Sequence, residues 1–168
     1  MVSGSNRRRQ TTARFDGRNS RGTRFAVKAY IDTSVLVKRY VSEPGSDALD
    51  TFLVTAQPDL IASELMRLEL VSTFGRKCRE GWFTSADLDK LQIQADADLL
   101  SGRIELVNVR GDLLQQALDL MRRLVQPLAT LDAIHLASAL SEHVDIFMTN
   151  DQQLSRAATE AGLATWTA

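Results

Sequence analysis

The segment Ala29-Tyr30-Ile31-Asp32-Thr33-Ser34 decides the fold class of this chain. Its first three residues are apolar and predict a short buried strand that ends at Asp32. A short helix is expected directly afterwards, from Ser34 to Tyr40. A buried strand that leads into a helix is the repeating unit of parallel α/β folds, so the remaining chain should show the same order.

Short apolar runs and longer helical patterns do alternate to the end of the chain, without internal repeats. Further strands are expected at 60–62, 105–109, 145–149 and 163–166, and further helices at 47–56, 64–80, 86–100, 111–126, 131–142 and 151–161. Ser63, Ser85 and Thr130 are the expected N-caps of three of these helices. This order predicts an α/β fold whose parallel sheet is covered by helices on both faces.

The composition is that of one globular domain. The chain has 168 residues, of which 44% are hydrophobic and 24% charged, so neither wholesale disorder nor a collagen-like repeat is expected. No run approaches 18 apolar residues, so no membrane-spanning helix is predicted. Cys78 is the one cysteine, which excludes an intrachain disulfide and a cysteine-based zinc site and favours a reducing cytoplasm.

The charge is divided unevenly along the chain. Residues 1–28 hold eight basic side chains and one acidic one, whereas the remaining 140 residues hold 12 basic and 20 acidic ones. Residues 1–26 are too polar to form a core and are predicted to be a disordered basic tail. The tail is interpreted either as an RNA-binding arm or as an inert or non-native segment, with Val27 as the true start. The folded domain is expected to span 27–168.

Four acidic residues are candidates for a functional site. Asp32 and Asp151 each follow a predicted strand, and ligands of open α/β sheets bind at the carboxyl ends of strands; either residue could instead only cap the next helix. Asp132 lies in the first turn of its predicted helix, where the dipole alone favours an acid. Glu69 lies in a largely apolar helix, where a carboxylate needs a metal or a salt bridge, with Arg76 as the alternative partner.

These carboxylates would repel one another if the sheet brought them to one cleft. Two like charges about 4 Å apart cost about 4 kcal/mol at an effective dielectric constant of 20. A divalent cation removes that repulsion, and carboxylate and water ligands suit Mg²⁺ or Mn²⁺ better than zinc. The acidic residues therefore predict a hard-metal site for phosphate chemistry.

Five short segments stand in a recognisable order and spacing. They are Tyr30-Ile31-Asp32-Thr33-Ser34, Lys38-Arg39-Tyr40 with Glu43-Pro44-Gly45-Ser46, Ser63 with Arg67-Leu68-Glu69-Leu70, Leu131-Asp132-Ala133-Ile134-His135-Leu136-Ala137, and Thr149-Asn150-Asp151. Over about residues 27–166 the chain resembles the PIN-domain nucleases, and in particular the VapC toxins of toxin–antitoxin pairs. The resemblance implies a three-layer αβα sandwich with a short, mainly parallel sheet. It also implies a metal-dependent endoribonuclease specific for single-stranded RNA, a VapB-like antitoxin that blocks the site, and a homodimer.

The resemblance implies roles for individual residues as well. The family's acidic quartet is matched by Asp32, Glu69, Asp132 and Asp151. Asp32 and Asp132 would bind the metal directly, Asp151 would bind a second metal or a metal-bound water, and Glu69 would orient or deprotonate the attacking water. Ser34 and Thr149 match polar positions that orient the carboxylates. Mg²⁺ or Mn²⁺ would neutralise charge on the scissile phosphate and lower the pKa of water, so no protein nucleophile is needed.

Positive side chains are needed to contact RNA, because the domain itself is acidic. Six basic residues of the first half could flank the cleft and contact phosphates, although each could be an ordinary solvated charge: Lys38, Arg39, Arg67, Arg76, Lys77 and Arg79. Lys38, Arg39 and Arg76 are the candidates chosen among them. Trp82-Phe83 could stack on a base or pack as a core contact. His135 is interpreted as a structural residue or a support for the ligands, since neutral imidazole is a poor partner for Mg²⁺.

Three other functions stay open on the sequence. A phosphatase or phosphotransferase with Asp32 as the nucleophile is disfavoured, because such enzymes carry a second acid two residues later, where this chain has Ser34. A catalytically silent PIN fold that serves as an interaction module is disfavoured by the intact acidic quartet. A non-toxin RNA-processing nuclease would share the same acidic core, and a gene for a small DNA-binding protein directly upstream would favour the toxin.

Overall fold

The computed structural model describes residues 26–168. The basic tail predicted for 1–26 therefore lies, apart from Ala26, outside the described residues. The strands are β1 (Lys28–Ile31), β2 (Asp59–Ser63), β3 (Ile104–Val107), β4 (Ile146–Met148) and β5 (Ala164–Trp166). The helices are α1 (Thr33–Leu36), the 3-10 helix η1 (Val37–Arg39), α2 (Ser46–Ala56), α3 (Met66–Arg79), α4 (Ser85–Leu100), α5 (Gly111–Arg123), α6 (Thr130–Ser141) and α7 (Gln152–Glu160).

The five strands form one sheet in the order β3-β2-β1-β4-β5. All four pairings are parallel. At the centre, Tyr30 of β1 lies opposite Ile61 of β2 on one side and Phe147 of β4 on the other. The strand order reverses at β1, so this central strand and its neighbours meet at the point where open α/β sheets bind ligands.

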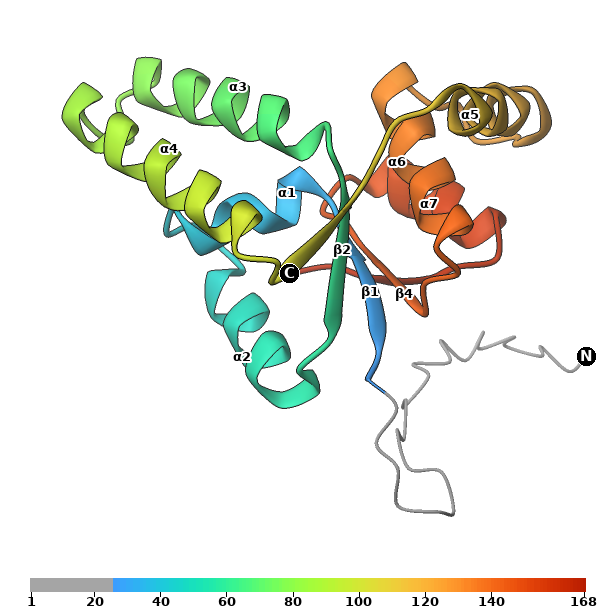
Figure 1. The fold of residues 1–168 in the computed structure, drawn as a ribbon, viewed down its shortest axis with the longest axis horizontal. Coiled ribbons are helices and arrows are strands. Elements are labelled where there is room, and N and C mark those ends of the chain that lie inside the picture. Colours follow the sequence, from blue (N-terminus) through green and yellow to red (C-terminus); the bar gives the residue numbers. More distant parts are fainter. Residues whose placement is uncertain (1–25) are drawn as a thin grey trace, which may run out of the picture.

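Helices cover both faces of the sheet, as predicted (Figure 1). On one face, Ile31 packs into a core with α1, α2, α3 and α4, in which Phe74 is the largest fully buried side chain. On the other face, Tyr30 packs into a second core with α5, α6 and α7. Successive residues of β1 therefore serve opposite faces, which is the alternation expected of an extended strand. The prediction of a three-layer α/β fold with a parallel sheet is confirmed.

Several helix boundaries differ from those expected. Ser63 is the last residue of β2 rather than an N-cap, and α3 begins three residues later at Met66. Thr84, not Ser85, caps α4. The Thr84 side chain accepts a hydrogen bond from the backbone N–H of Asp87, and the Asp87 carboxylate accepts one from the backbone N–H of Thr84. This reciprocal capping box satisfies two N–H groups at once, which selects Thr84 over its neighbour.

Two further helix ends also depart from the prediction. Ala129 rather than Thr130 is the N-cap of α6 and supplies no side-chain hydrogen bond. Helix α5 ends at Arg123, and Leu124 already has an extended conformation with ψ near 140°. The first helical segment is also divided, since α1 passes into the tighter η1 before Tyr40. These differences are of the size at which helix ends ordinarily vary.

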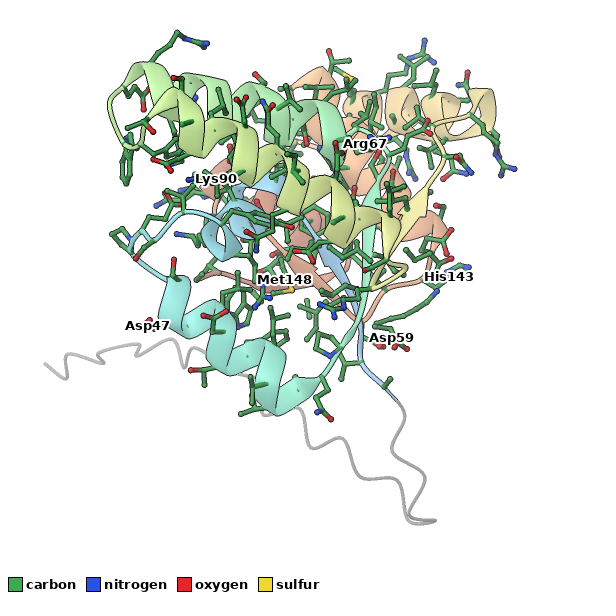
Figure 2. All side chains as sticks on the ribbon, turned by 60° about the vertical axis from the view of Figure 1, so that its left-hand side comes forward. Asp47, Asp59, Arg67, Lys90, His143 and Met148 are labelled. Carbon is green, nitrogen blue, oxygen red and sulfur yellow. The ribbon has the colours of Figure 1, made fainter. Side chains whose placement is uncertain are left out.

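The orientation of the sheet can be followed in Figure 2. Asp59, the first residue of β2, lies at the lower end of the molecule in that view, and Arg67, in the first turn of α3, lies at the upper end. The carboxyl ends of the parallel strands therefore face the edge from which α1 and α3 start. Within residues 26–168, no helix combines the length and the apolar character that crossing a membrane requires.

Replacement of Phe147 tests the packing of the α5–α7 face. Phe147 is fully buried, and its ring stacks on Tyr30 with a centroid distance of 5.2 Å. Phe147→Ala should lower the free energy of unfolding by about 3–5 kcal/mol. Val54→Ala, at an exposed position of α2, should change it by less than about 0.5 kcal/mol. Urea denaturation measures both, and a loss below about 1 kcal/mol for Phe147→Ala would contradict this packing.

Candidate active site

A cleft of about 740 Å³ opens at the carboxyl edge of the sheet. Its wall comes from α1, α3, the start of α6 and the residue before α7. All four predicted acidic residues line it: Asp32, Glu69, Asp132 and Asp151. The structure thus brings together carboxylates that the sequence separates by up to 119 positions, because β1 and β4 are neighbours and α3 and α6 both start at this edge.

Asp32 lies at the base of the cleft, at the end of β1, and is only 7% exposed. Its backbone N–H donates to Met148 O at 2.9 Å, which continues the β1–β4 pairing. Its carboxylate accepts three hydrogen bonds, from Thr33 N at 2.7 Å, Ser34 Oγ at 2.6 Å and Thr149 Oγ1 at 2.9 Å. Ser34 and Thr149, the two predicted supporting residues, therefore both contact Asp32 and fix the orientation of its carboxylate.

Glu69 reaches the cleft from α3. Its Oε2 accepts from Thr33 Oγ1 and lies 2.9 Å from His135 Nε2. Burial raises the pKa of Glu69, but the bond to His135, the charge of that ring and the bond to Thr33 together lower it below its usual value. The sequence left open a salt bridge to Arg76 or another base; the base is His135, whereas Arg76 pairs with Glu80 at 3.8 Å. Glu69 is instead an anion held by neighbours on α1 and α6.

A buried chain of hydrogen bonds stands behind Glu69. His135, 1% exposed, places Nδ1 at 2.7 Å from the Tyr30 hydroxyl, which accepts from Ser63 N at 3.0 Å. In the neutral ring, Nδ1 accepts the Tyr30 proton and Nε2–H donates to Glu69; in the charged ring, both nitrogens donate. Each buried side-chain polar atom of this chain of bonds has a partner. Burial lowers the pKa of His135, yet the bond and charge of Glu69, with Asp32 and Asp132, raise it above its usual value.

Asp132 and Asp151 complete the acidic wall. Burial, and then the charges of Asp151 and Asp32, raise the pKa of Asp132 above its usual value. Asp151 caps α7, since its Oδ1 accepts from Gln153 N at 2.7 Å and Leu154 N at 3.0 Å. The capping alternative from the sequence is therefore true of Asp151, and the residue lines the cleft at the same time. The repulsion between neighbouring carboxylates thus adds to burial in raising the pKa of Asp132.

The residues of the cleft fit a hard divalent cation. Oxygen atoms of carboxylates are the ligands that Mg²⁺ and Mn²⁺ prefer. Asp32, Glu69 and His135 can offer ligand atoms that all lie within 4.8 Å of one another, but His135 is turned to Glu69 and Tyr30. A cation beside Asp32 and Asp132 would remove the repulsion that raises the pKa of Asp132.

The basic candidates are placed unequally. Arg76 lines the cleft. Arg39 points elsewhere, pairing with Asp50 at 3.0 Å beside a separate hollow between α2, β2 and α4. Lys38 binds the Pro44 carbonyl and lies 3.6 Å from Glu43. The structure thus brings only Arg76 of these three into contact with the cleft.

Some residues of the cleft were not among the site residues expected from the sequence. Thr33 bonds Glu69 directly, and Tyr30, behind the cleft, supports it through His135. Glu43 and Lys77 line the cleft. A signal existed for Tyr30, because a hydroxyl in the middle of a buried strand must find a partner. Lys77 belongs to the basic residues that the sequence offered as possible phosphate contacts, but nothing in the sequence distinguishes it from its neighbours at the end of the helix.

Comparison with known proteins agrees with the fold. The PIN-domain family model matches residues 29–160, and the chain belongs to the PIN-domain family. Two curated relatives come from Mycobacterium tuberculosis. Ribonuclease VapC46 is 36% identical over 137 residues, which are 80% of this chain and 93% of the relative. Ribonuclease VapC47 is 32% identical over 144 residues, which are 81% of this chain and 93% of the relative.

Solved structures share the same fold at lower identity. M. tuberculosis VapC20, described as a toxin that cleaves the sarcin-ricin loop, superposes with a TM-score of 0.63 at 17% identity, covering 82% of this chain and 97% of that one. VapBC2 from Rickettsia felis, bound to a DNA fragment of its promoter, gives a TM-score of 0.58 at 14% identity, with 84% and 98% covered. The fold is thus that of VapC proteins, as the sequence resemblance implied.

Removal of one hydroxyl tests the chain of bonds behind Glu69. Tyr30→Phe should lower the free energy of unfolding by about 1–3 kcal/mol, because Ser63 N–H and His135 Nδ1 lose a buried partner. Tyr40→Phe is the matched control, since its hydroxyl bonds a half-buried Asp98 at 3.2 Å, and it should cost less than about 1 kcal/mol. Guanidinium denaturation measures both; equal losses would contradict the special position of Tyr30.

Proposed function

We propose that this protein is a Mg²⁺- or Mn²⁺-dependent endoribonuclease that hydrolyses phosphodiester bonds of single-stranded RNA and acts as the toxin of a toxin–antitoxin pair. The observation that carries the proposal is the convergence of Asp32, Glu69, Asp132 and Asp151 on one cleft of a PIN fold. The names of the curated relatives, both ribonucleases, support the same activity.

The acidic side chains have two roles, metal binding and the positioning of the attacking water. Asp32 and Asp132 would hold the metal, and Asp151 stands beside them to hold water or a second ion. The metal supplies charge neutralisation at the scissile phosphate and a lower pKa for the attacking water. Asp32 is fixed for this task by Thr33, Ser34 and Thr149, so its oxygens need little rearrangement when a cation arrives.

Glu69 is the group suited to orient the attacking water. Its pKa lies below the usual value, so the carboxylate is charged at neutral pH and can accept a hydrogen bond from that water. His135 and Thr33 both bond Oε2, which fixes the rotamer of the side chain. A proton acceptor must lie within hydrogen-bond reach of the group it serves, and the three residues behind Glu69 maintain that position.

The same geometry argues against Asp32 as a nucleophile. Oδ1 accepts from Thr33 N, and Oδ2 accepts from Ser34 Oγ and Thr149 Oγ1. These three hydrogen bonds occupy most of the acceptor positions of the carboxylate, so few lone pairs are left for an attack on phosphorus. A hydrolysis by activated water therefore fits this cleft better than a phosphatase with an aspartyl intermediate.

The proposed partners are an RNA substrate, a VapB-like antitoxin and a second copy of the chain. Arg76, at the cleft, is the predicted cation best placed to meet a phosphate. VapBC2 of R. felis, which shares the fold, is a complex with DNA of its promoter, and this supports an antitoxin partner. Exposed apolar residues on one side of α5, namely Leu114, Leu118 and Met121, suit a protein contact. RNA as the substrate would place the activity in the cytoplasm.

Neutralising one carboxylate tests the metal site without relying on activity alone. Asp132→Asn should lower Mn²⁺-dependent RNA cleavage more than about 100-fold and remove the rise in melting temperature that Mn²⁺ gives the wild type. In EDTA the variant should be at least as stable as the wild type, since the charges of Asp151 and Asp32 disfavour the carboxylate. Calorimetry with and without Mn²⁺ measures the second effect.

The control for that experiment is Asp89→Asn, at an exposed position of α4 outside the cleft. It should keep both the cleavage rate and the stabilisation by Mn²⁺. If Asp132→Asn kept either one at the level of Asp89→Asn, the assignment of Asp132 as a metal ligand would be wrong.

Growth of cells tests the toxin half of the proposal. Induced expression of the wild-type protein should arrest a bacterial host, whereas Asp32→Asn should not, because it removes a charge from the metal site. Co-expression of the gene directly upstream should relieve the arrest by the wild type. Normal growth with abundant, catalytically active wild-type protein would instead indicate an RNA-processing nuclease that is not a toxin.

A further inference from the structure

A second cluster of charged and aromatic groups lies at the far end of α3 from Glu69. Lys77 is only 10% exposed as a side chain. Its Nζ donates to Glu43 Oε2 at 2.6 Å and lies 4.0 Å from the centroid of the Trp82 ring. The ammonium group is therefore held between a carboxylate and the face of an indole, in a fixed position.

The charges of this cluster do not balance. Lys38 Nζ lies 3.6 Å from Glu43 Oε1, so two ammonium groups share one carboxylate. Lys38 also binds the Pro44 carbonyl, which holds it on the loop side of Glu43. One positive charge remains, in a largely enclosed setting where an uncompensated charge is unfavourable. An anionic ligand that reached the cluster would neutralise it.

Trp82 offers a surface that the core does not use. It is 51% exposed, whereas its neighbour Phe83 packs against the core of the α1–α4 face. The sequence left open whether Trp82 and Phe83 stack on a base or pack in the core, and the structure packs Phe83. Trp82 stands with Lys77 on one turn, because its backbone N–H donates to Lys77 O at 3.1 Å. An exposed indole ring beside a fixed cation can stack on a flat aromatic group such as an unpaired base.

The cluster is continuous with the acidic cleft. Glu43, Arg76 and Lys77 line the same cavity as the four carboxylates. Lys77 is eight residues beyond Glu69 on α3, which is about 12 Å along the helix axis. Figure 1 shows α3 running from the carboxyl edge of the sheet out to the turn with α4, where Trp82 lies. A chain molecule cut at the acidic end would therefore pass Arg76 and Lys77 before it reached Trp82.

We propose that Lys77 and Trp82 form a binding subsite for a nucleotide next to the cut in single-stranded RNA. The Lys77 ammonium takes a backbone phosphate, the Trp82 ring stacks on the following base, and Glu43 positions the ammonium. Proteins that hold single strands combine cations along the backbone with aromatic rings that stack on unpaired bases. The inference rests on the proposed ribonuclease function and identifies how the substrate strand is held outside the reacting centre.

Tryptophan fluorescence provides the direct test. The chain has two tryptophans, and Trp166 packs against Phe52 at a centroid distance of 5.0 Å. In EDTA, where no cleavage is expected, a 12-nucleotide oligouridylate should quench the fluorescence of the wild type. Trp82→Phe should abolish the quenching, and the same strand annealed to oligoadenylate should not cause it, because its bases are already stacked and paired.

Affinity measurements test the two charged residues in opposite directions. Fluorescence anisotropy of a labelled oligouridylate should show about 5- to 10-fold weaker binding for Lys77→Met and for Trp82→Ala. Glu43→Gln should bind about 2- to 5-fold more tightly, because it removes the negative charge that the lysines share. An ion pair that only joined α3 to the loop would make Glu43→Gln neutral or weaker. Arg103→Met, before β3 and 77% exposed as a side chain, removes one positive charge away from the cleft and should bind as the wild type.

The outcomes separate this inference from the proposed function. Quenching that Trp82→Phe abolishes, with the opposite shifts of Lys77→Met and Glu43→Gln, supports the subsite even if the wild type cleaves no RNA with Mn²⁺. Cleavage by the wild type without quenching, and with Trp82→Ala binding as tightly as the wild type, overturns the subsite and leaves Trp82 as a protein-contact residue. If Lys77→Met does not fold, Glu43→Gln and the two Trp82 variants still decide the question.

Discussion

A carboxylate that is almost fully buried must be held by fixed donors, and the junction of β1 and β4 is built around that need. Asp32 receives its hydrogen bonds from Thr33 and Ser34 on its own helix and from Thr149 across the sheet. Asn150 secures the same junction, since its backbone N–H donates to Ser34 Oγ at 3.0 Å and its side chain donates to the Ser34 carbonyl at 3.2 Å. Thr33, Ser34 and Thr149 each make a further hydrogen bond to another residue. The position of Asp32 therefore depends on the pairing of β1 with β4.

The other acids differ because their surroundings move their pKa values in opposite directions. Burial and the charges of Asp151 and Asp32 raise the pKa of Asp132, and within residues 26–168 its carboxylate makes no salt bridge that would offset them. Glu69 makes such a salt bridge with His135, and its pKa is lowered. Groups whose environments separate their pKa values in this way serve different roles in catalysis. Asp132 is suited to bind a cation, and Glu69, a fixed anion, is suited to orient a water molecule.

The fold and the positions of the acids could be predicted from local pattern, whereas their partners could not. Alternating strands and helices, with Asp32 and Asp151 at two strand ends, were enough to place both residues at one edge of a parallel sheet. The partner of Glu69 is His135, 66 residues away, and no spacing rule connects them. Arg39 stays a prediction as an RNA contact; its side chain pairs with Asp50 and is not among the residues that line the cleft.

The distance between the two ends of the cleft explains how an acidic domain can hold RNA. Near Asp32 and Asp132 a phosphate is repelled until a cation is bound, so metal and substrate must strengthen each other's binding at that end. Lys77 lies about 12 Å beyond Glu69 along the axis of α3, slightly more than the Debye length of about 8–10 Å at 0.1–0.15 M salt. Its attraction for a phosphate therefore depends less on a bound metal than that of a group beside Asp32. A strand can be captured at the basic end first and reach the carboxylates when a cation has weakened their negative field.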